Sequence, residues 1–151
     1  MRKRLKRIKE SVTEPEYKKL MNAVRGDESI RENTRSNLLR AFTILYFTGL
    51  RLNELQQMKL QHIKDLMEQG SCKLILSKTN SERKLFAGEE FQKQLKKLFM
   101  VNESTDLQSH VITKGSSKSL RVGINHDVFI KQVNRLLAKL NFSHLKNHGQ
   151  N

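Results

Sequence analysis

Several residue types with special structural or chemical roles are scarce in the sequence. Its 151 residues include one cysteine, one proline and no tryptophan, and aromatic residues make up only 6%. The single cysteine, Cys72, excludes an internal disulfide and a cysteine-based zinc cluster, so we expect a reducing compartment. The scarcity of aromatic rings argues against the stacking platforms that bind single-stranded nucleic acids.

Long apolar runs are also missing. No segment approaches the roughly 18 apolar residues of a membrane-spanning helix, and the first residues have no apolar signal core. The five histidines are scattered along the chain, so we expect no dedicated metal site and no cofactor. We expect a protein that is not secreted. It would lie in the cytoplasm with the nucleoid, or in a stroma or matrix if an organelle encodes it.

Positive charge is abundant. Lysine and arginine number 29 against 15 acidic residues, which gives a formal net charge of +14 and a pI near 10.2. Such a charge exceeds the roughly 2 to 8 of a typical small soluble domain. It predicts a polyanionic partner, and nucleic acid is the best candidate. A chain of this size buries roughly 70% of its unfolded surface, which is enough for one domain with a core.

The pattern of apolar residues predicts a mainly helical α+β domain, with five or six helices around a small antiparallel sheet. Residues 1–12 are strongly basic and read as an arm or linker, and residues 13–151 form the domain. We expect helices over 13–26, 36–47, 51–58, 88–99 and 127–140, a hairpin over 73–86, and a loop over 102–125 with a short strand at 111–112.

The segment from Phe47 to Leu55 is the most informative for function. A buried helix ends at Gly49, and Arg51 follows at once on a new helix start. A guanidinium beside free backbone N–H groups suits a phosphate, because its planar fork holds two oxygens together. Glu54 lies one turn later and would fix the arginine rotamer. Taken by itself, the pattern is better explained by a surface Arg–Glu pair worth under about 1 kcal/mol.

Two other segments complete the candidate site. The sequence Leu-Ser-Lys-Thr-Asn-Ser-Glu-Arg at residues 76–83 is a polar hairpin tip, where a lysine is usually just solvated. The sequence His-Leu-Lys-Asn-His at residues 144–148 follows the last predicted helix and reads equally well as a frayed tail.

The sequence Thr-Gly-Leu-Arg-Leu-Asn-Glu-Leu at residues 48–55 resembles the first signature of the tyrosine recombinases, the phage integrase family. The resemblance implies that Arg51 grips the non-bridging oxygens of the scissile phosphate and that Glu54 supports it. It implies that Lys78, in the hairpin, donates a proton to the departing 5′ oxygen, with Lys84 as the alternative. Arg83 would be a further phosphate contact.

The same resemblance shows where this sequence departs from the family pattern. His144 and His148 would belong to its His-x-x-Arg-His box, but Asn147 stands in place of the second catalytic arginine. In a rival alignment the segment matches the helix just beyond the box. The family's nucleophilic tyrosine would follow the box, and this sequence has none there. We expect Tyr17 and Tyr46 to be core residues. The catalytic domain thus reads as C-terminally incomplete, which would leave Leu136, Leu137 and Leu140 partly uncovered.

The expected function is that of a DNA-binding protein of recombination and integration, inactive alone, with double-stranded DNA and other recombinase protomers as partners. Intact relatives break and rejoin DNA through a phosphotyrosyl intermediate without a metal. One alternative is a general nucleic-acid-binding module that uses charge alone. A complete enzyme of another class ranks last, because no phosphate loop or other nucleophile motif is present. A divided enzyme, completed by another chain, is a further variant.

Overall fold

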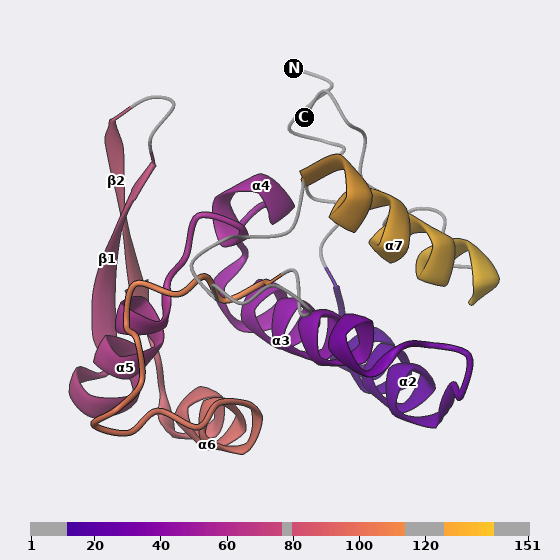
Figure 1. Ribbon diagram of the computed structural model, residues 1–151, viewed down its shortest axis with the longest axis horizontal. Helices are drawn as coiled ribbons and strands as arrows, with labels where there is room; N and C mark the ends of the chain where they lie inside the picture. The colour runs from indigo at the N-terminus through magenta and orange to yellow at the C-terminus, as the bar shows by residue number, and fades with distance from the viewer. Residues whose placement is uncertain (1–11, 77–79, 114–125, 141–151) are drawn as a thin grey trace.

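The structure is a computed structural model that describes residues 12–76, 80–113 and 126–140, with the side chains of residues 126 and 127 excepted. Within these ranges the domain is α+β and mainly α, as predicted, with six helices and one hairpin (Figure 1). No helix in the described ranges is both long and apolar enough to cross a membrane. The elements in chain order are α2 (Glu14–Gly26), α3 (Glu32–Thr48), α4 (Leu52–Leu55), α5 (Leu60–Gln69), β1 (Ser71–Leu76), β2 (Ser81–Phe86), α6 (Glu89–Leu98) and α7 (His126–Lys139).

Helix α2 begins at the predicted capping box. The Thr13 hydroxyl accepts from the Glu16 N–H, and the Glu16 carboxylate accepts from the Thr13 N–H at 3.0 Å. These reciprocal bonds satisfy donors that a helix start leaves free. The buried stripe of α2 packs against α3 and consists of Tyr17, Leu20, Met21 and Val24.

Helix α3 is the central element and is longer than the predicted 36–47. It begins at Glu32, and it ends where Gly49 adopts a left-handed conformation with φ of 72°. The Gly49 N–H donates to the Leu45 carbonyl at 2.9 Å, which closes the helix end. The predicted core role of Tyr17 and Tyr46 is confirmed, because their rings stack at 4.3 Å and both pack in or against the core.

The predicted helix over 51–58 was wrong in extent. Helix α4 stops at Leu55 because Met58 turns inward, where its carbonyl accepts from the Val111 N–H at 3.1 Å. A separate helix, α5, then follows, although the sequence analysis did not identify it. In α5 the residues Ile63 and Leu66 are fully buried, and the helix packs against β1.

The hairpin predicted over 73–86 is formed and begins two residues earlier, at Ser71, with β1 and β2 antiparallel and Leu76 opposite Ser81. One face, with Cys72 and Leu74, is buried, whereas Ile75 and Phe86 are exposed on the other. The strand expected at 111–112 is not formed. Val111 and Ile112 are nevertheless buried, next to an isolated bridge between Lys59 and His110.

The leucines of α7 are covered, contrary to the expectation from the sequence. Leu136 and Leu137 are 5% and 2% exposed, and Leu140 packs against the core at its edge. The helix lies along α3 and the α2–α3 turn (Figure 1), and Leu136 faces Leu38 across a cavity. Lys139 also bonds to Asp27 at 2.8 Å, so the last described helix is held against the end of α2.

Candidate phosphate-binding site

The junction between α3 and α4 presents Arg51 to solvent. Thr48 supports this turn, because its hydroxyl donates to the Ile44 carbonyl at 2.6 Å and accepts from the Leu50 N–H at 3.2 Å. Leu50 and Leu52 are both buried, on either side of Arg51 in the chain. Their burial anchors the backbone and leaves Arg51 exposed between them.

Glu54 holds the backbone of Arg51 instead of its guanidinium. One carboxylate oxygen of Glu54 accepts from the Arg51 N–H at 2.9 Å. The other accepts from Nη1 of Arg83 at 3.0 Å, and the Glu54 side chain is only 14% exposed. A charge-assisted bond in this half-buried position is stronger than a neutral one. Glu54 therefore ties the start of α4 to strand β2.

Arg83 reaches Glu54 because of the hairpin register. It lies opposite Leu74, on the face of the hairpin that packs inward, and its side chain is 42% exposed. Lys84, the alternative to Lys78, is on the other face, where its ammonium lies 5.7 Å from the centre of the Phe86 ring. Lys84 thus points away from the Glu54 network, and Arg83 points toward it.

The site is electropositive. The Glu54 carboxylate is paired with Arg83, and the Arg51 guanidinium has no hydrogen-bond or ion-pair partner among the described residues. A free guanidinium fork is a good binder of phosphate oxygens. Helix α4 has only four residues, so the expected contribution of a helix dipole is small, and the charge at this site is that of the side chains.

Three of the predicted site residues lie outside the described residues: Lys78, between the two strands, and His144 and His148, beyond α7. The structure thus brings Arg51, Glu54 and Arg83 together and leaves the other three as predictions. Sequence reasoning had named Arg83 but not its bond to Glu54. Among the residues that the structure describes, no three His, Cys, Asp or Glu side chains gather as a metal site.

Comparison with known proteins assigns the family of the chain. Residues 10–150 match the phage integrase family, which is nearly the whole chain. The protein therefore belongs to the phage integrase family, and the domain is of the tyrosine recombinase type. No curated protein and no solved structure gives a significant match to the chain.

Proposed function

We propose that this domain binds the backbone of double-stranded DNA, with Arg51 as the residue that grips one phosphate. The observation that carries the proposal is the Arg51 guanidinium, which has no partner within the described ranges, on a turn whose backbone is anchored by Glu54. Pre-organisation matters here, because a cation held in place loses less conformational entropy when it binds a phosphate. Family membership and the net charge of +14 support DNA as the partner.

Glu54 and Arg83 act together in this proposal as a brace between α4 and the hairpin. Lys78 follows β1 by two residues in the sequence and lies outside the described residues. We retain the role of Lys78 as the proton donor to the 5′ oxygen. His144 and His148 would contact the same phosphate, and Arg83 would add positive potential beside it. Residues 1–12 would be a basic arm along neighbouring phosphates.

We further propose that these 151 residues do not cleave DNA by themselves. The tyrosines of the sequence are Tyr17 and Tyr46, and both serve the core. The Tyr17 hydroxyl is hydrogen-bonded to Thr43, and burial raises the pKa of this phenol, which keeps it protonated. Asn147 in place of a second arginine removes a donor whose loss typically costs 100-fold or more in rate. Strand cleavage would need these groups from elsewhere, such as another protomer.

The test of DNA binding compares Arg51→Ala and Arg51→Lys with a matched control, Lys93→Ala. Lys93 is an exposed residue of α6. Affinity for a 20-base-pair duplex is measured by fluorescence anisotropy at several salt concentrations. We expect Arg51→Ala to weaken binding about tenfold and to reduce the salt slope by about 0.9, the value of one lost phosphate contact. Arg51→Lys keeps the charge but not the fork, so it should retain the slope and lose part of the affinity.

Lys93→Ala should change the affinity less than twofold at high salt, where distant charges are screened. Equal losses for Arg51→Ala and Lys93→Ala at high salt would mean that binding depends on overall charge, as in a general nucleic-acid-binding module. A preference for single-stranded over duplex ligands would lead to the same conclusion.

A further inference from the structure

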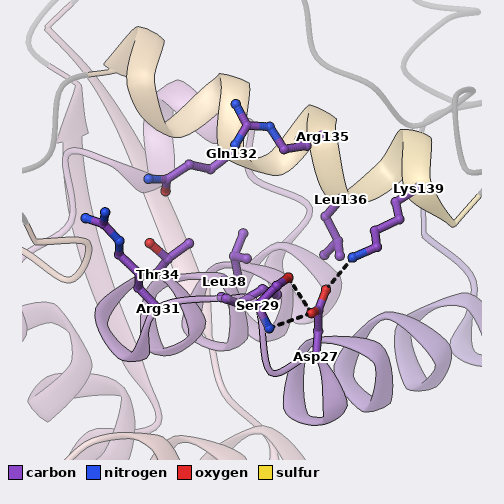
Figure 2. A pocket seen from close by; sticks show the side chains of 10 residues that line it. Asp27, Ser29, Arg31, Thr34, Leu38, Gln132, Arg135, Leu136 and Lys139 are labelled. Carbon is purple, nitrogen blue, oxygen red and sulfur yellow. Dashed lines mark hydrogen bonds and ion pairs between the residues drawn. The ribbon is translucent and has the colours of Figure 1, made fainter.

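A groove separates α7 from the first turns of α3 and the α2–α3 turn (Figure 2). It contains a cavity of about 390 Å³. Leu38 on α3 and Leu136 on α7 give the cavity an apolar floor, and both side chains are buried. Cavities of this size with an apolar floor and a few polar groups are the usual form of a binding site. The sequence analysis had not identified this groove, because its two sides are about 100 residues apart in the chain.

The charge of the groove is positive and not compensated. Asp27 is its acid, and this carboxylate is already bonded to Lys139 at 2.8 Å and to the Ser29 hydroxyl at 2.6 Å. Arg31 and Arg135 also line the groove, from its two sides, and both side chains are exposed. Neither guanidinium has a hydrogen-bond or ion-pair partner within the described part of the chain. Arg31 and Arg135 thus place two positive charges at the rim of the groove, with no counter-charge among the described residues (Figure 2).

The groove also lacks a hydrogen-bond donor for Gln132. The amide oxygen of Gln132 is buried and has no partner in the described structure, although the side chain lines the cavity beside Arg135 (Figure 2). An unpaired buried acceptor is unfavourable, and an N–H group from a ligand would satisfy it. The occupant that fits must bring negative charge, an N–H donor and some apolar surface.

We propose that this groove binds an acidic peptide segment of a partner protein. One carboxylate would pair with Arg31 and another with Arg135, a backbone N–H would donate to Gln132, and an apolar side chain would lie against Leu38 and Leu136. A DNA phosphodiester supplies the charge but neither the donor nor the apolar side chain. A peptide supplies all three, so the groove chemistry favours protein over nucleic acid.

The composition of these 151 residues argues against an occupant from among them. Residues 114–125 and 141–151 contain no acidic residue, and residues 1–11 contain only Glu10 among six basic side chains. A second copy of this chain, with a net charge of +14, matches the charge of the groove less well than an acidic segment does. An acidic partner would instead be attracted, and attraction between unlike charges raises the association rate.

This inference does not depend on DNA binding by Arg51. Helix α3 has 17 residues, so at about 1.5 Å per residue its two ends lie roughly 25 Å apart. Arg31 precedes the first end and Arg51 follows the second. Loss of one function therefore leaves the other measurable.

The test titrates the full ¹⁵N-labelled chain with a blocked peptide of sequence Glu-Leu-Glu-Glu-Leu and follows NMR shifts. Millimolar peptide detects even weak binding. We expect saturable shifts of the Thr34 amide and the Arg135 Nε–H. Control peptides replace every glutamate by glutamine or every leucine by serine, and each should bind at least fivefold more weakly.

The variant Arg31→Ala/Arg135→Ala is compared with Lys93→Ala/Lys96→Ala, which removes the same charge from two exposed residues of α6. Peptide affinity should fall about tenfold in the first variant and less than twofold in the second. Gln132→Met removes the acceptor and should weaken binding about threefold to tenfold.

Absence of saturable shifts, or equal losses in the two double variants, overturns the proposal. A selective loss of duplex DNA affinity in Arg31→Ala/Arg135→Ala, with peptide binding unchanged, overturns it as well and assigns the groove to a phosphate. Peptide binding that is retained when Arg51→Ala weakens DNA binding supports it.

Discussion

At the scale of single residues, Glu54 has the most consequential contacts of the candidate site. It accepts from the Arg51 N–H and from the Arg83 guanidinium, and its side chain is only 14% exposed. We expect Glu54→Gln to lower the free energy of unfolding by about 2 kcal/mol, because it removes a charge-assisted bond and leaves Arg83 with a weaker acceptor. Urea denaturation followed by circular dichroism measures this change.

The matched control is Glu82→Gln, the same substitution at an exposed ion pair. Glu82 lies 3.9 Å from Lys73, and both side chains are more than half exposed. Such a pair contributes about 0 to 1 kcal/mol, so the control should change stability little. If the two variants lose equal stability, the brace between α4 and β2 does not form in solution.

The sequence predicted part of this network and not the rest. Arg51 and Glu54 are three residues apart at a helix start, so their proximity follows from local spacing. The bond from Glu54 to Arg83 joins residues 29 apart, and it depends on how the hairpin packs against α4. No periodicity in the sequence contains that information.

At the scale of the elements, Gly49 ends α3 and begins the turn that carries Arg51. Its φ of 72° is a left-handed conformation, and an added Cβ would meet no atom within 4 Å. The cost of Gly49→Ala is therefore conformational, about 1 to 2 kcal/mol. Thermal unfolding should show a melting temperature several degrees lower, since 1 kcal/mol shifts the melting temperature of a domain of this size by roughly 2 to 4 °C.

Gly88→Ala is the control for this prediction. Gly88 precedes α6 with φ of −80°, and an added Cβ there also meets no atom within 4 Å. The two substitutions add the same methyl group to open space and differ in backbone conformation. A melting temperature that falls equally in both would mean that α3 does not end in the left-handed turn.

The elements that the sequence predicted best are those with their own local signals. The capping box fixes the start of α2, and Gly49 fixes the end of α3. The region after Leu55 was predicted poorly because its structure is determined by distant residues. Met58 is turned inward by Val111, and Lys59 is bridged to His110, so the chain starts α5 anew instead of continuing α4. The same contacts bury Val111 and Ile112 without a strand.

At the scale of the whole molecule, the ion pair of Asp27 with Lys139 joins residues 112 apart. The hydrogen bonds from Lys139 and Ser29 hold the pKa of the Asp27 carboxyl well below its usual range. A carboxyl whose pKa is lowered by folding stabilises the protein above its unfolded pKa of about 3.9, and this stabilisation is lost as the pH falls through the folded pKa.

We therefore expect Asp27→Asn to melt at a lower temperature than the wild type at pH 7, and the difference to shrink below about pH 4. Melting temperatures between pH 7 and pH 2 measure this. Glu14→Gln removes an exposed carboxylate paired with Lys18 at 3.4 Å and serves as the control, with a small difference at every pH. A difference for Asp27→Asn that stays constant with pH contradicts the assignment.

Fold class and family were predictable from the sequence, whereas the burial of α7 was not. Leu136 and Leu137 form a clear apolar stripe, but the sequence does not say what covers it. The structure shows that the α2–α3 region supplies part of the cover, since Leu38 and Leu136 line one cavity and Lys139 is fixed to Asp27. Which residues cover the apolar side of α7 depends on how the folded chain packs, and not on the local sequence.

The position of α7 has a consequence for synthesis on the ribosome. Asn37 on α3 binds the carbonyl and the N–H of Thr113, and the neighbouring part of α3 faces α7. Helix α3 emerges from the ribosome early. The segment at Thr113 that covers one side of α3 is made about 75 residues later, and α7, which covers the other side, about 100 residues later. Because contacts between such distant residues close slowly, Leu38 and its neighbours stay open to water and to chaperones until translation has passed α7.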